Sequence, residues 1–436
     1  MADERIPIFD LAYYYWLVGK YSTSLNYRAD LDAPLDPAAL RQAVQETVQR
    51  LPSFTRTLGT DGYSCYYEDN GGELPVTFGP WQPLFLGTAA TNRYLFYVNA
   101  DGNELRVCLS HGLADGRASL IFMRTLLFFY LRAAGLAGGT ADQALGAVPP
   151  SWTKTLPDFA KQLVKPEAQP VYTYAAKDIF RIPEPEDLKL NRHFVLQLDT
   201  AATMKLTRQY EVTPVPLLLT VLNEAMRHCY DAGDQDIIAL VSVDGRPFYG
   251  VKAIDNFAFS PAIPERASAQ KYDVSLRATA LRGRMDLLLQ RENLDAMLRQ
   301  MVEAESLYYQ KEEPLLPFLE KTSARLAHDE RQAFTYVLTY FGRTMLPACV
   351  APHVRGLHIA MPTGILPLDM VVLDDRGRME IQVAQTFASD RLIRAFAEKL
   401  RQYDIPVTMQ DKGWLVASSL DLAQIFPEGA GQMGER

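Results

Sequence analysis

The stretch that decides the fold runs from Glu104 to Gly116 and reads Glu-Leu-Arg-Val-Cys-Leu-Ser-His-Gly-Leu-Ala-Asp-Gly. Its first seven residues carry leucine, valine and leucine at alternate positions, which predicts a half-buried strand. Residues 118–134 then form a long apolar run typical of a buried helix, and Gly135 ends it. His111 is therefore expected on a tight turn at the end of a strand, where a rigid scaffold presents its side chain.

His111 has the residue type and the setting that general base catalysis needs. Imidazole is the side chain whose ordinary pKa lies closest to neutral pH, so it can take a proton from a hydroxyl or amine that attacks a thioester. Asp115 is better placed to hold the turn, by an ion pair or backbone hydrogen bonds, than to touch a substrate. A single His at a strand end is more often structural, but the surrounding strand and apolar helix favour the functional interpretation.

The composition is that of a globular chain with an acidic surplus. It has 436 residues, of which 48% are apolar and 22% charged, and a net charge of −8. The length predicts two or three domains, and the negative charge argues against a partner made of nucleic acid. We recognise no signal peptide and no transmembrane segment, and the four cysteines lack metal-site spacing. A cytoplasmic protein with reduced cysteines and no metal is expected.

Helix and strand patterns alternate along the chain, which predicts an α/β fold. Residues 6–33 are expected to form one or two strands, and the aromatic cluster Tyr13–Trp16 is interpreted as core packing. Residues 137–190, rich in proline, glycine and alanine, are expected to connect two domains, with a short helix at 157–164. Further helices are expected over 36–52, 201–210, 216–230, 270–312 and 389–403, and further strands over 53–58, 62–68, 94–100, 193–198, 236–243, 334–341, 355–360, 367–373 and 378–384.

Residues 110–116, Ser-His-Gly-Leu-Ala-Asp-Gly, resemble the HHxxxDG signature of the chloramphenicol-acetyltransferase-like superfamily. That group includes condensation domains of nonribosomal peptide synthetases, wax-ester synthases, polyketide-associated acyltransferases and alcohol acyltransferases. Residues 36–52 are similar to the family's first helix. Residues 241–260 resemble a segment of its second half, in which a strand ends in Arg-Pro and an Asn-Phe element follows. The chain looks most similar to stand-alone bacterial alcohol-acyltransferase-like members.

The resemblance implies a fold of two chloramphenicol-acetyltransferase-like subdomains with mixed β-sheets flanked by helices. Residues 1–175 would form the N-terminal subdomain, which carries the motif, and residues 176–436 the C-terminal subdomain. The active-site channel would lie at the subdomain junction with His111 near its middle, and donor and acceptor would enter from opposite faces.

The resemblance also implies roles for individual residues. His111 falls on the second, catalytic His of the signature, and Asp115 and Gly116 fall on its structural Asp and Gly. Arg246 falls where members carry an arginine that pairs with that Asp across the junction. Ser110 departs from the signature, because many members have the first His there, and we expect no catalytic role for it.

Three further polar residues have less context. Asn256 could donate to the oxyanion of a tetrahedral intermediate or line the channel, or it could cap the turn before Phe257; the frequency of asparagine in turns favours the turn. His353 and His358 lack a carboxylate or cysteine at ligand spacing, so we expect them to be structural. The charged stretch 282–312 is expected to be a solvated helix face.

The expected activity is acyl transfer from a thioester, either acyl-CoA or an acyl carrier protein, to an alcohol or amine. No bound cofactor is expected. A Gly-x-Ser-x-Gly elbow is absent from the sequence, so no covalent acyl-enzyme is expected either. Two alternatives stay open: a non-catalytic condensation-like module that binds an acyl group or a carrier protein, and a thioester hydrolase that uses the same His with water.

Overall fold

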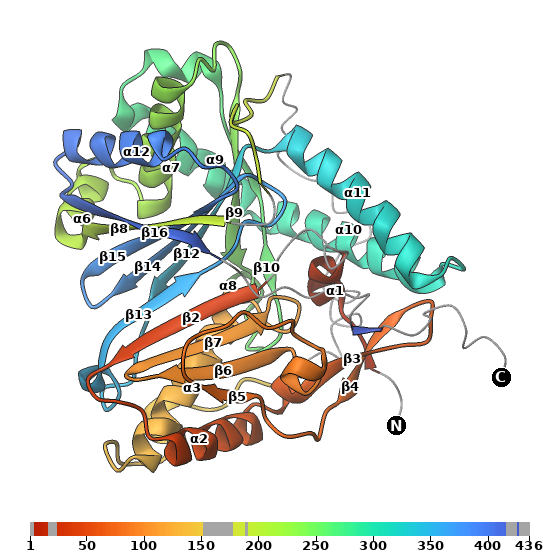
Figure 1. Cartoon of the computed structure of the whole chain (residues 1–436). Helices are drawn as coiled ribbons and strands as arrows, with labels where there is room; N and C mark the ends of the chain where they lie inside the picture. The colour runs from red at the N-terminus through yellow and green to blue at the C-terminus, as the bar shows by residue number, and fades with distance from the viewer. Residues whose placement is uncertain (1–3, 16–23, 151–177, 188–190, 416–424, 427–436) are drawn as a thin grey trace.

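A computed structural model describes residues 4–15, 24–150, 178–187, 191–415 and 425–426. Two lobes stand one above the other, each built on its own β-sheet, and a pair of long helices lies along one side (Figure 1). Among the described residues, no helix is both long enough and apolar enough to cross a membrane. The expected boundary at 175/176 and the expected helix at 157–164 lie outside the described residues.

The first lobe is a five-stranded sheet in the order β13-β2-β7-β6-β5. Two helices, α2 and α3, pack against each other beneath this sheet (Figure 1). Asp36 begins α2, because its carboxylate accepts a hydrogen bond from Ala39 N at 2.7 Å and Pro37 occupies the first turn. The bounds are β2 Ser24–Leu31, α2 Pro37–Arg50, β5 Val76–Phe78, β6 Phe96–Asp101, β7 Glu104–Ser110, α3 Gly116–Ala133 and β13 Val354–Ala360.

The second lobe is a mixed sheet in the order β10-β9-β12-β14-β15-β8-β16, with β11 also paired to β9. Strand β12 runs parallel to both β9 and β14. The other strand pairs that the structure describes in this sheet are antiparallel. Helices α7, α9 and α12 cover its upper side (Figure 1). The bounds are β8 Asn191–Asp199, α6 Thr200–Gln209, α7 Pro214–Cys229, β9 Ile237–Asp244, β10 Ala258–Phe259, β11 Ala262–Glu265, α9 Val274–Leu288, β12 Tyr336–Arg343, β14 Leu368–Asp375, β15 Arg378–Gln385, α12 Arg391–Gln402 and β16 Val407–Leu415.

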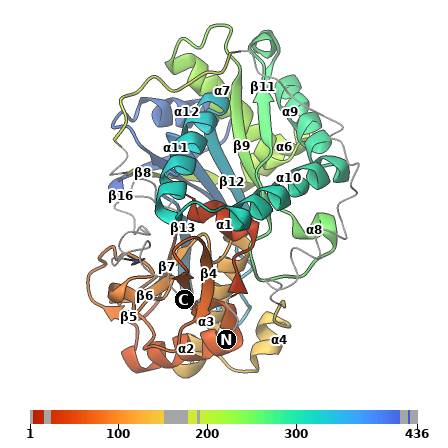
Figure 2. The same ribbon diagram turned by 90° about the vertical axis from the view of Figure 1, so that its right-hand side faces the viewer.

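A third group of elements lies beside the junction of the lobes, where α10 and α11 pass close to α1 (Figure 2). Glu305 of α10 accepts a hydrogen bond from Ile8 N at 2.8 Å, and Tyr309 accepts from Ile6 N at 2.7 Å, so α10 fixes the start of α1. The bounds are β1 Glu4–Arg5, α1 Ile8–Tyr14, β3 Arg56–Thr60, β4 Cys65–Asp69, α8 Arg246–Tyr249, α10 Arg291–Gln310 and α11 Leu315–Ala333. Helix α4, Ala141–Leu145, instead packs against α3 in the first lobe.

Most expected elements are found, but the N-terminal prediction is wrong in part. Residues 8–14 form helix α1 rather than a strand, because Pro7 precedes a run whose apolar side chains pack against α10 and the first lobe. The stretch 282–312 is not simply a solvated face, since Leu294, Leu298 and Tyr308 of α10 are buried. Helix α11 and strand β16 were not expected from the sequence.

The two sheets face each other across the junction, and alternate residues of β14 face opposite ways. Leu368, Met370 and Val372 lie in the core of the second lobe. Val371 and Leu373 instead belong to the core cluster of the first lobe. The odd-numbered residues of β14 therefore face the first lobe.

Candidate active site

The turn that carries His111 follows the last residue of β7 and leads directly into α3. The His111 side chain is 8% exposed, and the ring of Tyr13 from α1 stacks on it with centroids 3.7 Å apart and planes inclined by 17°. Tyr13 is only partly buried, so it is an outer wall for the imidazole.

Burial sets the protonation of His111. It lowers the pKa of the imidazole to about 4, while contact with its own backbone carbonyl and the charge of Asp115 offset part of this effect. Within the described part of the chain, the Nδ1 atom has no hydrogen-bond partner of good geometry. The imidazole is therefore neutral at pH 7 and able to accept a proton.

Asp115 ties the His111 turn to both lobes. Its carboxylate caps α3 by accepting from Ala118 N at 2.9 Å. The other oxygen accepts from Phe257 N at 2.8 Å and pairs with Arg246 Nη1 at 2.9 Å. A helix cap, a backbone bond and an ion pair thus converge on one buried carboxylate.

Arg246 lies in the first turn of α8, just after β9, and is also buried. Its Nε donates to Ala253 O at 2.7 Å, and its Nη1 pairs with Asp244 at 2.8 Å as well as with Asp115. Burial alone would lower the pKa of this guanidinium, but the two carboxylates raise it. Arg246 therefore stays charged and joins the second lobe to the turn of the first.

Two glycines of the motif are required by close packing. A Cβ at Gly116 would lie 2.4 Å from the ring of Phe341 on β12. One at Gly112 would lie 2.4 Å from the ring of Tyr14. The close approach that Gly116 permits is to a strand of the second lobe.

Asn256 supports the turn from below. Its Nδ2 donates to Asp10 Oδ1 at 2.7 Å and to the carbonyls of His111 and Gly112 at 2.9 and 3.1 Å. The amide hydrogens are already used by these acceptors, and the side chain is 1% exposed. In this geometry the amide supports the His111 turn, not the turn before Phe257 that the sequence favoured.

Three supporting residues were missed by sequence reasoning. Asp10 and Tyr67 complete the network below the turn, with the Tyr67 hydroxyl 2.9 Å from both Asp10 Oδ2 and Gly112 O. Burial and the neighbouring Asp255 raise the pKa of Asp10 well above its usual range. Tyr13 did have a signal, as part of an aromatic cluster, but its stacking on His111 depends on a contact between distant segments.

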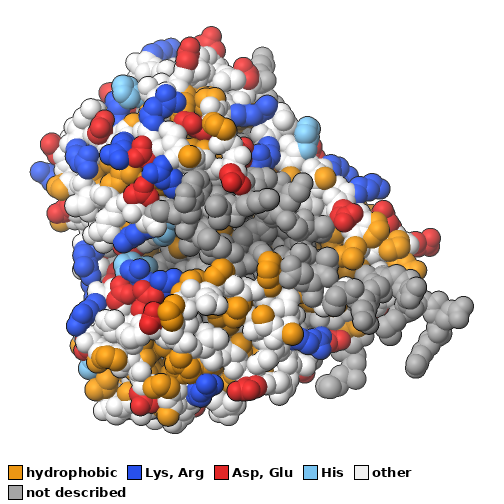
Figure 3. All heavy atoms as spheres, viewed as in Figure 1, with side chains coloured by type: hydrophobic (Ala, Val, Ile, Leu, Met, Phe, Trp, Pro, Cys, Tyr) orange, Lys and Arg blue, Asp and Glu red, His pale blue; other side chains and the backbone are white. Residues whose placement is uncertain are grey.

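His358 lies elsewhere, in a cleft of about 970 Å³ between β2 and β13 on one side and β8, β15 and β16 on the other. Its Nδ1 is 2.7 Å from Glu380 and its Nε2 is 3.3 Å from Asp30, an arrangement we call the His358 clasp. Burial alone would lower its pKa, but the two carboxylates raise it to about 9. Figure 3 shows acidic and basic side chains gathered where the lobes meet at the left.

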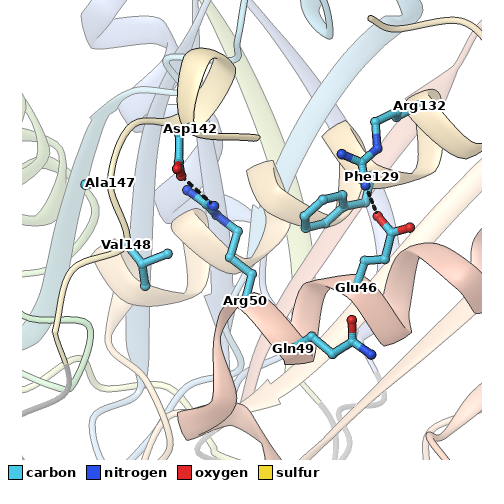
Figure 4. A pocket seen from close by; sticks show the side chains of 8 residues that line it. All are labelled: Glu46, Gln49, Arg50, Phe129, Arg132, Asp142, Ala147 and Val148. Carbon is cyan, nitrogen blue, oxygen red and sulfur yellow. Dashed lines mark hydrogen bonds and ion pairs between the residues drawn. The ribbon is translucent and has the colours of Figure 1, made fainter. Parts of the chain in front are cut away.

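Other features do not extend the site. The hollow between α2, α3 and α4 contains the ion pairs of Arg50 with Asp142, at 2.8 Å, and of Arg132 with Glu46 (Figure 4). It lies at the far side of the first lobe from the second. His353 is 3.5 Å from Asp32, and no cluster suited to a metal ion is found among the described residues.

Comparison with known proteins identifies the fold. No family model matches the sequence, and no curated protein matches it. The epimerization domain from the third module of tyrocidine synthetase B has a TM-score of 0.61 at 14% identity, with 92% of this chain and 95% of that chain covered. TRI101 of F. sporotrichioides, solved with coenzyme A and T-2, has 0.57 at 11%, with 93% and 99% covered. Polyketide synthase associated protein 5 from Mycobacterium tuberculosis has 0.59 at 15%, with 92% and 98% covered.

The chain therefore has the two-lobed α/β fold of condensation-type domains and chloramphenicol-acetyltransferase-like proteins. This confirms the fold expected from the motif. At these identities the likeness establishes the fold, and the activity has to be argued from the site.

Proposed function

We propose that this protein is an acyltransferase that moves an acyl group from a thioester to a hydroxyl or amine acceptor. His111 acts as the general base and removes the acceptor's proton as the acceptor attacks the thioester carbonyl. The thiol leaves, taking up the proton that the imidazole received. The observation that carries the proposal is a neutral imidazole on a turn that both lobes hold in place.

Direct transfer fits the side chains near the turn better than a covalent intermediate does. Burial raises the pKa of the Cys65 thiol to about 12, so it is not a thiolate at neutral pH. Burial also raises the pKa of the Cys229 thiol. This residue lies in α7, on the outer side of the second lobe. The sequence shows no Gly-x-Ser-x-Gly elbow, and none of its cysteines has a supporting histidine in its sequence context.

We propose acyl-CoA as the donor, with an acyl group on a carrier protein as the alternative. TRI101, which shares the fold, was solved with coenzyme A, and the tyrocidine synthetase domain comes from a modular peptide synthetase. Neither donor needs a cofactor held by the chain itself. The supporting roles of Asp115, Gly116, Arg246 and Asn256 belong to this proposal, and the cytoplasmic location stays a prediction.

The leading alternative is a non-catalytic module that binds an acyl group or a carrier protein. A second alternative is hydrolysis, in which water replaces the acceptor. The retention of His111 and of the network around Asp115 favours catalysis, because a binding module has no need of a rigidly held neutral imidazole.

Thiol release from a panel of acyl-CoAs tests the proposal, with and without pooled alcohols and amines, in the wild type and in His111→Ala. Acceptor-dependent release that disappears in His111→Ala is the expected result. Release that needs no acceptor would indicate a hydrolase. Release unchanged in His111→Ala would rule out the mechanism, and none from acyl-CoA or a loaded carrier protein would favour the binding module.

A further inference from the structure

The polar network beneath the His111 turn has more acceptors than its side chains have hydrogens to donate. The Tyr67 hydroxyl has one hydrogen but lies 2.9 Å from both Asp10 Oδ2 and Gly112 O. The Asn256 amide has two hydrogens, and its Nδ2 lies 2.7 Å from Asp10 Oδ1 and 2.9 and 3.1 Å from two carbonyl oxygens of the turn. Three hydrogens therefore face four oxygen atoms, two in the Asp10 carboxyl and two in the turn.

Two neighbouring groups do not supply the missing hydrogen. The Tyr14 hydroxyl contacts the Tyr67 hydroxyl at 3.1 Å, and within the described part of the chain it makes no hydrogen bond to Asp10. Arg56 pairs with Asp255 at 3.1 Å, and its guanidinium carbon lies 5.2 Å from the centroid of the Tyr67 ring. One oxygen of this buried network therefore lacks a donor unless Asp10 itself is protonated.

A proton on Asp10 Oδ2 satisfies the whole network. Asp10 then donates to the Tyr67 oxygen, which leaves the Tyr67 hydrogen for Gly112 O. Asn256 gives its two hydrogens to Asp10 Oδ1 and to His111 O. An ionised Asp10 would instead compete with Gly112 O for the Tyr67 hydrogen, and a buried carbonyl without a good donor destabilises the fold.

The surroundings of Asp10 also favour the un-ionised acid. The residue is 1% exposed, and burial, together with the charge of Asp255, raises the pKa of its carboxyl. Hydrogen bonds from Asn256 and Tyr67 and the charge of Arg56 act in the other direction, but the pKa stays well above its usual range. This direction agrees with the proton that the distances require.

We infer that Asp10 is protonated and is a positioning residue for His111. Its proton directs hydrogen bonds to both carbonyls of the turn, and the orientation of these two peptide groups sets the direction of the imidazole. Helix α1 carries Asp10 and also Tyr13, whose ring stacks on the imidazole at 3.7 Å. Asp10 thus ties the turn to the helix that covers His111. The link to catalysis rests on the proposed function, but the proton on Asp10 does not.

The variant Asp10→Asn tests the proton without any measurement of activity. The amide has the shape of a protonated carboxyl, donates to Tyr67 and accepts from Asn256, but it does not ionise. An unfolded chain loses the Asp10 proton at about pH 4, whereas the folded chain keeps it, so the wild type takes up a proton when it folds. The wild type should therefore lose stability relative to Asp10→Asn as the pH rises.

Urea unfolding of the full chain at pH 5, 6 and 7 measures this difference, and the midpoint of Asp10→Asn should rise further above that of the wild type at each step. Asp255→Asn is the matched control. It makes the same change at a neighbouring buried acid that has a cation 3.1 Å away. Its midpoint should lie below that of the wild type at all three pH values, because Arg56 loses its partner.

Acyl-transfer rates test the positioning role. Asp10→Ala and Tyr67→Phe should each lower kcat by at least about tenfold with KM nearly unchanged, because they displace the base and not the substrate. Asp10→Asn should keep kcat within about twofold of the wild type, because its amide donates the same hydrogen bond. A kcat for Asp10→Asn as low as that for Asp10→Ala would rule out positioning through a donated hydrogen.

A midpoint difference that stays constant or shrinks as the pH rises would show that Asp10 is ionised in the folded protein, and would overturn the inference. If Asp10→Asn does not fold, infrared spectra of the wild type and Tyr67→Phe at pH 7 take its place. The carbonyl stretch of an un-ionised carboxyl should shift when the Tyr67 oxygen is removed, and an unchanged spectrum would overturn the inference equally.

The two arms also separate this inference from the proposed function. A midpoint difference that grows with pH, in a protein that transfers no acyl group, would leave the proton on Asp10 standing while the proposed activity fails. Acyl transfer by the wild type, with a midpoint difference that does not grow, would do the reverse.

Discussion

His111 and His358 lie at the same junction between the lobes but in opposite electrostatic surroundings. His111 is buried, and burial lowers its pKa to about 4. The charge of Asp115 offsets only part of this effect. His358 is held between Asp30 and Glu380, which raise its pKa to about 9. Burial is common to both, so the acids that touch the ring decide whether a histidine is a neutral base or a charged structural link.

The largest effect that this comparison predicts is on activity at His111. His111→Ala should lower kcat/KM by about a thousandfold, the usual size for loss of a general base. His358→Gln is the control, because it removes an imidazole that does not touch the Asp115 network. Acyl-transfer rates at pH 7.5 would check this, and equal losses in the two variants would contradict the contrast between them.

The second effect is on stability at the link between the lobes. Arg246→Ala leaves Asp115 buried without its cation and should destabilise the fold by about 3–5 kcal/mol. The double variant Asp115→Asn/Arg246→Met removes both charges and should recover much of the loss. Urea unfolding of the three proteins measures this, and a double variant no better than Arg246→Ala would show that the pair's charge is not what matters.

The third effect is the pH dependence of the His358 clasp. Its pKa is raised from 6.5 to about 9, so the clasp stabilises fully below pH 6.5 and loses its effect as the pH rises through 9. His358→Gln should therefore cost up to about 3 kcal/mol at pH 6 and little at pH 10. Thermal unfolding across this range would check the sign, and a cost that grows with pH would contradict it.

The smallest effect concerns the pH at which kcat/KM begins to fall on the acid side, where His111 becomes protonated. His111 must be neutral to act as a base, and its pKa lies below the ordinary 6.5. We therefore expect kcat/KM to stay nearly constant from pH 8 down to about 6 and to fall only at lower pH. A limb centred at or above 6.5 would mean that another group controls the base.

The sequence predicts local features of this site better than distant ones. The strand, turn and helix around His111 follow from residues within one stretch, and the family resemblance adds Arg246 as the partner of Asp115. From the sequence, the aromatic cluster that contains Tyr13 is interpreted as core packing. The contact of Tyr13 with His111 could not be predicted, because it joins segments about a hundred residues apart.

The burial of Asp369 on the face of β14 that is directed at the first lobe could also not be predicted, and the reason is a different one. It sits in an apolar run, Leu-Pro-Leu-Asp-Met-Val-Val, that reads correctly as a buried strand. Both faces of that strand are covered, one by helices of its own lobe and one by the other lobe. Which face Asp369 occupies depends on how two distant sheets meet.

Strand β13 has a consequence for how the protein is made. His358 and Asp30 are 328 positions apart, yet β13 completes the sheet to which β2 belongs. During translation the edge of β2 stays unpaired for tens of seconds, until β13 has left the ribosome. A nascent or truncated chain ending before residue 354 exposes that edge to other chains, so we expect such fragments to depend on chaperones or to aggregate, although they contain the complete motif.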